Sequence, residues 1–74
     1  MQEIKQFFIN IGKGDIDENE QNLVSNDIID SLDILNLVNE IEKYYDKELD
    51  SSLIQPKNFE SFRNIQKIIC SLQA

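Results

Sequence analysis

The chain has 74 residues, a formal net charge of −7, one cysteine and no histidine or tryptophan. A chain of this length forms one domain over residues 1–74 and buries only about 60% of its unfolded surface, which leaves little room for a deep substrate cleft. Without histidine, acid–base catalysis near neutral pH needs a strongly shifted carboxylate or lysine, so the composition disfavours an enzyme.

The acidic residues are concentrated in the middle of the chain. Twelve of the 14 lie between Asp15 and Asp50, where the basic residues are Lys43 and Lys47. The negative electrostatic field of these residues repels nucleic acid and anionic membranes and attracts partners with basic patches. The apolar runs are too short for a membrane span, and a lone cysteine without a signal-peptide pattern favours the cytoplasm. We expect Cys70 to be a small buried residue.

The first predicted element is an amphipathic helix within MQEIKQFFINIG, ended by Gly12 and Gly14. Its apolar residues recur at i, i+3, i+4 and i+7: Ile4, Phe7, Phe8 and Ile11. A long polar loop follows. We expect its apolar residues to attach it to the core: Leu23, Val24, Ile28 and Ile29.

A calcium-binding pattern in this loop is incomplete. Asp15, Asp17 and Asn19 match ligand positions 1, 3 and 5, but Glu20 replaces the required glycine and Asn26 the bidentate glutamate. No metal site is therefore predicted.

The strongest predicted helix is DSLDILNLVNEIEKYYDKEL, residues 30–49, with Asp30 as N-cap and Asp33 in the first turn. One face is apolar: Ile34, Leu37, Val38, Ile41 and Tyr45. Leu35 lies off this stripe. Residues 50–60 predict a short helix interrupted at Pro56, and a last helix begins near Ser61. The fold class is therefore all-α, a bundle of three main helices and one short helix.

Ser31 admits two interpretations. As part of a helix start, Asp-Ser-Leu-Asp is a cap followed by tolerated first-turn residues. This explains Asp30 and Asp33 but neither the position of Leu35 nor the acidic excess around this helix. Alternatively, Ser31 is an attachment point, since a phosphate esterified there would lie beside free backbone N–H groups at the helix N-terminus.

The sequence resembles the acyl carrier proteins, a family of phosphopantetheine-binding carriers. The resemblance rests on Asp30-Ser31-Leu32-Asp33, the apolar pattern that follows it, and the closing segment NFESFRNIQKII. It covers essentially the whole chain and implies the family's four-helix bundle. It also implies that a phosphopantetheinyl transferase attaches 4'-phosphopantetheine from coenzyme A to Ser31, and that the arm carries an acyl or aminoacyl group as a thioester.

The resemblance further implies a partner-binding helix on a monomeric, non-catalytic carrier. Asp30 would be read by the transferase, Leu32 and Leu35 would make apolar contacts, and Asp33, Glu40 and Glu42 would face basic patches on loading and using enzymes. Asn36 and Asn39 belong to the same expected surface.

The chain departs from the family's fatty-acid carriers at several positions. Asn36, Asn39 and Lys43 stand where fatty-acid carriers usually have acidic or larger apolar residues, which disfavours a role in fatty acid biosynthesis. The segment Ile28-Ile29-Asp30-Ser31 instead resembles that of small stand-alone carriers of amino acids, such as the D-alanyl carrier. Asp27 lies where many carriers have glycine, and we expect it to adopt the turn because Asp tolerates left-handed conformations. The rival hypothesis is a non-carrier acidic helical interaction module.

Overall fold

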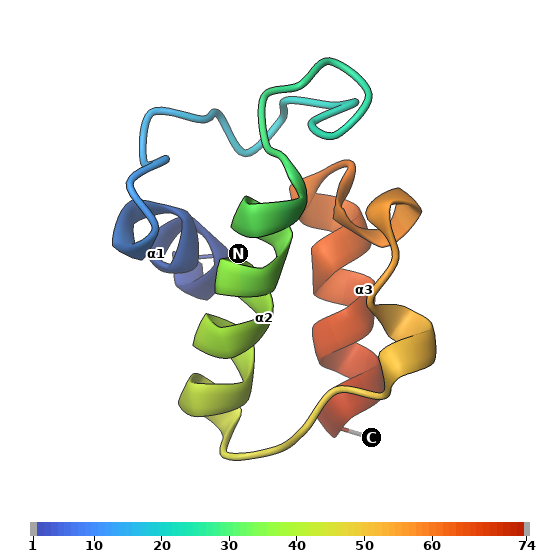
Figure 1. The fold of residues 1–74 in the computed structure, drawn as a ribbon. Coiled ribbons are helices and arrows are strands. Elements are labelled where there is room, and N and C mark those ends of the chain that lie inside the picture. The colour runs from blue at the N-terminus through green and yellow to red at the C-terminus, as the bar shows by residue number, and fades with distance from the viewer. Residues whose placement is uncertain (1, 74) are drawn as a thin grey trace.

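Three α-helices form the framework of the computed structural model, which describes residues 2–73 (Figure 1). They are α1 (Gln2–Asn10), α2 (Ser31–Tyr45) and α3 (Phe62–Gln73). A long loop, residues 11–30, joins α1 to α2, and α2 and α3 run in the same direction. Residues 2–73 contain no strand. The predicted all-α class, its three main helices and the long first loop are confirmed.

α1 ends at a glycine with a left-handed backbone. Gly12 has φ of 83°, and its N–H donates to the carbonyl of Ile9 at 3.0 Å while the N–H of Lys13 donates to Phe8 at 2.8 Å. These two bonds satisfy carbonyls that the last helical turn leaves unpaired, and only glycine takes this conformation without strain. Gly14 is needed for a different reason, because a Cβ there would lie 2.8 Å from Cγ1 of Ile9.

α2 ends four residues earlier than predicted. Asp46 adopts the left-handed conformation, with φ of 54° and ψ of 44°, and its N–H bonds to the carbonyl of Glu42. The chain then turns, and Leu49 is buried with its N–H donating to Oε2 of Glu42 at 2.8 Å. The helix stops because residues 46–49 return Leu49 to the core.

The predicted short fourth helix is not an α-helix. Residues 50–60 instead contain two single 3₁₀ turns, η1 (Ser51–Leu53) and η2 (Pro56–Phe59). Gln55 between them is extended, with φ of −131° and ψ of 146°, as expected for a residue that precedes proline. Pro56 therefore breaks the segment into two turns, and Phe59 in the second is fully buried.

The core lies where the helices meet. α1 packs against α2 and α3, η2 packs against α2 and α3, and the rings of Phe8 and Phe62 stack at 4.6 Å between centroids. The predicted helix stripes are confirmed as largely buried, although Ile11, Tyr45 and Leu72 are half-buried at the edge of the core. Cys70 was predicted to be buried and is exposed, since Ile68 and Ile69 take the inward positions of α3.

The long loop is attached to the core as predicted. Leu23 and Ile29 are fully buried, and Val24 and Ile28 pack partly against the same cluster. Ile16 is also buried, although no periodic pattern in the sequence marks it as a core residue. Over residues 2–73, no helix is both long enough and apolar enough to cross a membrane.

Candidate functional site

Ser31 is the first residue of α2 and is exposed. Asp30 before it is the N-cap: its Oδ1 accepts the N–H of Asp33 at 3.0 Å, and Oδ2 of Asp33 accepts the N–H of Asp30 at 3.1 Å. This reciprocal capping box confirms the predicted cap and fixes the backbone on both sides of Ser31. The Ser31 hydroxyl makes no hydrogen bond within residues 2–73, so its position depends on where the backbone places the Ser31 Cβ.

The capping box also changes the acidity of Asp30. The N–H of Asp33 holds the pKa of the Asp30 carboxyl below its ordinary value of 3.8, and the charge of Lys13 acts in the same direction. A carboxylate stabilised in this way is a poor proton acceptor for the Ser31 hydroxyl. Asp30 is thus suited to hold the helix start rather than to activate the serine.

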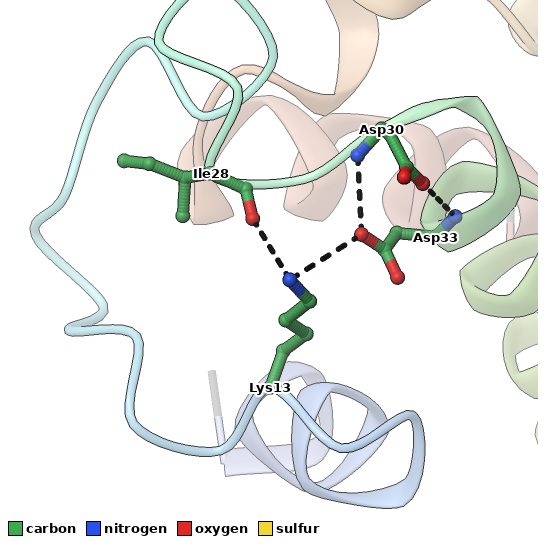
Figure 2. A network of polar contacts seen from close by, with 4 residues as sticks. All are labelled: Lys13, Ile28, Asp30 and Asp33. Atoms are coloured by element: carbon green, nitrogen blue, oxygen red, sulfur yellow. Dashed lines mark hydrogen bonds and ion pairs between the residues drawn. The ribbon is translucent and has the colours of Figure 1, made fainter.

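Lys13 connects the beginning of the long loop to the beginning of α2 (Figure 2). Its Nζ donates to the carbonyl of Ile28 at 3.2 Å and lies 3.7 Å from Oδ2 of Asp33. Its two contacts therefore lie on either side of Ser31 in the sequence.

Glu60 holds the other end of the loop. The carboxylate accepts the N–H groups of Val24 and Ser25 at 2.8 and 3.0 Å and the hydroxyl of Ser25 at 2.5 Å, while the Glu60 carbonyl accepts the N–H of Leu23 at 2.9 Å. Asp27 closes this turn with φ of 58°, which confirms the left-handed conformation expected there. The loop is consequently anchored to the segment that begins α3.

The outward face of α2 carries two exposed leucines. Leu32 is 63% exposed and Leu35 55%, and Asn39 lies on the same face because positions i, i+3 and i+7 of a helix align. Asn36 is half-buried beside them. The structure thus brings together the apolar part of the predicted partner surface.

The predicted acidic contacts lie on the flanks of this face and have partners within the chain. Asp33 belongs to the capping box, Oε1 of Glu40 accepts the Asn10 amide at 2.7 Å, and Glu42 accepts the N–H of Leu49. These carboxylates stabilise the fold as well as adding to the negative field around α2.

Lys13 and Glu60 were not recognised in the sequence. Their partners are at least 15 and 35 residues away, and no short-range pattern marks such contacts. Within residues 2–73, no group of three His, Cys, Asp or Glu side chains could hold a metal ion.

Comparisons of the chain with protein-family models, curated proteins and solved structures found no match.

Proposed function

We propose that this chain is a carrier protein with an acyl-carrier-like fold, whose Ser31 bears a 4'-phosphopantetheine arm. The observation that carries the proposal is the exposed Ser31 at the first position of α2, held between the two aspartates of a capping box and beside two exposed leucines. The capping box accounts for Asp30 and Asp33, but it accounts for neither leucine. A docking face beside an attachment point accounts for both.

The geometry around Ser31 fits the arm. The hydroxyl is accessible and uncommitted within the described residues, and the N-terminus of a 15-residue helix favours an attached phosphate. When bound, the arm supplies a terminal thiol that holds the cargo as a thioester. The Ser31 oxygen bonds to phosphorus as the anhydride bond of coenzyme A breaks, and adenosine 3',5'-bisphosphate leaves.

A separate transferase has to accept the proton of Ser31. The chain has no histidine, and the low pKa of Asp30 makes that carboxylate a weak base. The carrier itself then catalyses nothing. Its contribution is to present Ser31 on a fixed backbone and to dock on its partners.

The partner surface of the proposed carrier is the outward face of α2. Leu32 and Leu35 supply apolar contact area, while the acidic residues around the helix attract basic patches on the transferase and on acyl- or aminoacyl-transferring enzymes. Charge-steered contacts of this kind give fast association with brief lifetimes, which suits a monomeric cytoplasmic shuttle. An aminoacyl cargo is preferred to a fatty-acyl one because Asn36, Asn39 and Lys43 make this face less acidic than that of fatty-acid carriers.

The test is the intact mass of the protein after incubation with coenzyme A and a phosphopantetheinyl transferase of broad specificity. Wild type and Ser51→Ala each gain one arm, and Ser31→Ala gains none. Ser51 is the matched control because it is also an exposed serine that directly follows a capping aspartate, Asp50. A folded wild type that gains no mass contradicts the proposal and favours the acidic interaction module.

A further inference from the structure

We infer that Lys13 is a positioning residue for the modification of Ser31, a role that rests on the proposed carrier function. Lys13 lies in the first loop, 18 residues before Ser31, and it contacts the chain immediately before and after that serine. Figure 2 shows its ammonium group directed toward the carbonyl of Ile28 and the carboxylate of Asp33.

The first step of the argument is mechanical. The Ser31 side chain has no hydrogen bond of its own in the described part of the chain, so the path of residues 28–33 fixes the Cβ that carries the hydroxyl. Ile29 is buried and anchors the segment from one side. Lys13 anchors it from the other, through the Ile28 carbonyl and through Asp33, whose carboxylate also accepts the N–H of Asp30.

The second step is electrostatic. Asp30 and Asp33 place two carboxylates in one capping box, and Lys13 is the cation whose ion pair with Asp33 offsets their repulsion. The Asp33 side chain is only 14% exposed, so this pair is screened by solvent less than an open surface pair. Without Lys13, the capping box loses both its compensating charge and its connection to the first loop.

A small displacement of the acceptor oxygen is costly in group transfer. A misplacement of about 1 Å lowers the rate about 10²-fold, because the reacting atoms have to lie in near-attack geometry. A partial loosening of residues 28–33 should therefore reduce the turnover of the transferase by about tenfold without unfolding the carrier.

Lys5 of α1 provides a matched control because it contacts the same loop. Its Nζ donates to the carbonyl of Ile16 at 2.6 Å, so it also holds the long loop to α1, but 15 residues before Ser31. Lys5→Met and Lys13→Met change the net charge equally and each removes one lysine-to-carbonyl bond. Only Lys13→Met removes a contact to the segment that carries Ser31.

The experiment measures kcat and KM of the broad-specificity transferase for the carrier variants, at a temperature where circular dichroism shows each variant folded. Lys13→Met lowers kcat about tenfold with KM within about twofold, whereas Lys5→Met and Lys13→Arg keep kcat within about twofold of wild type. A change in charge steering alone would instead alter KM equally in both methionine variants. Amide exchange of Asp30 is faster in Lys13→Met only.

The inference is overturned if folded Lys13→Met is modified with the kcat of wild type, or if Lys5→Met loses as much kcat as Lys13→Met. Failure of the proposed function gives a different result, because wild type itself then accepts no arm.

Discussion

At the scale of single residues, the start of α2 explains why aspartate precedes the proposed attachment serine. The Asp30 carboxylate accepts the N–H of Asp33, and the N–H of Asp30 donates to the Asp33 carboxylate, which satisfies donors that the first helical turn cannot pair internally. The same contacts lower the pKa of the Asp30 carboxyl. One side chain thus holds the helix start and is a poor base for the neighbouring hydroxyl.

Two substitutions of Asp30 distinguish the effect of its capping hydrogen bond from the effect of its negative charge. Asp30→Ala removes the acceptor and should lower the Tm by roughly 5 °C, while Asp30→Asn keeps an acceptor oxygen and should remain close to wild type. Thermal melts followed by circular dichroism near neutral pH distinguish the two. Equal losses in both variants would show that the negative charge at the helix N-terminus, rather than the hydrogen bond, holds the helix.

At the scale of elements, the long loop behaves as part of the folded structure. Leu23 and Ile29 are buried, and the carboxylate of Glu60 accepts two backbone N–H groups and a hydroxyl of the turn that follows residue 22. These contacts join the segment before α2 to the segment before α3. The position of Ser31 therefore depends on residues far from it in the sequence.

This anchor predicts a dependence of stability on pH. The Ser25 hydroxyl, followed by its N–H, holds the pKa of the Glu60 carboxyl below its ordinary value of 4.5. Because the folded-state pKa is the lower one, the contribution of Glu60 is present above pH 4.5 and is lost as the pH falls through the folded-state value.

Glu60→Gln should accordingly lower the urea midpoint at about pH 7 and match wild type at an acidic pH below the folded-state pKa of Glu60, where the wild-type carboxyl is protonated. Glu48→Gln is the control, since it removes the same charge from a side chain that makes no hydrogen bond within residues 2–73. A Glu60→Gln midpoint that stays below wild type by the same amount at both values would contradict the pH assignment.

The two faces of α2 should respond differently to truncation. Leu37→Ala opens a cavity in the core and should cost about 2–5 kcal/mol, whereas Leu35→Ala should change the free energy of unfolding by about 0.5 kcal/mol or less. Leu37 is fully buried and Leu35 is 55% exposed. Urea unfolding measures both values.

In the proposed carrier, Leu35→Ala also raises the KM of the transferase, and an unchanged KM would remove Leu35 from the docking face.

At the scale of the whole molecule, the protein combines a small hydrophobic core with a strongly acidic surface. The chain carries −7 over 74 residues, and α1, α2 and α3 close around a cluster whose largest members are phenylalanines. A chain of this length has a total stability of about 4–11 kcal/mol. A single core truncation can therefore remove a large share of it.

The loss of stability caused by a core truncation should be clearest at Phe8. Its ring is fully buried and stacks on Phe62, so Phe8→Ala should cost about 3–5 kcal/mol. Ile9, the next residue of α1, is 49% exposed, and Ile9→Ala should cost about 1 kcal/mol or less. Chemical denaturation of the two variants tests the assignment, and similar losses in both would mean that α1 does not bury the predicted face.

The sequence was informative wherever the deciding contacts are local. Helical periodicity predicted the three main helices, and Asp30 with Asp33 marked the start of α2. One error arose where tertiary contacts override the local pattern, since α2 ends at Tyr45 because Leu49 turns back into the core. Cys70 was expected to be buried from its residue type, but the helical spacing of Ile68 and Ile69 leaves it on the outer side of α3. Lys13 and Glu60 were missed because their bonds join distant segments.

The most direct test of the central claim is the fragment mass spectrum of the protein after reaction with coenzyme A and the transferase. The chain contains six serines, and fragmentation assigns the added mass to one of them. The account predicts the arm on Ser31 and on no other residue. An arm on Ser25 or on any other serine, or a folded protein without an arm, would contradict it.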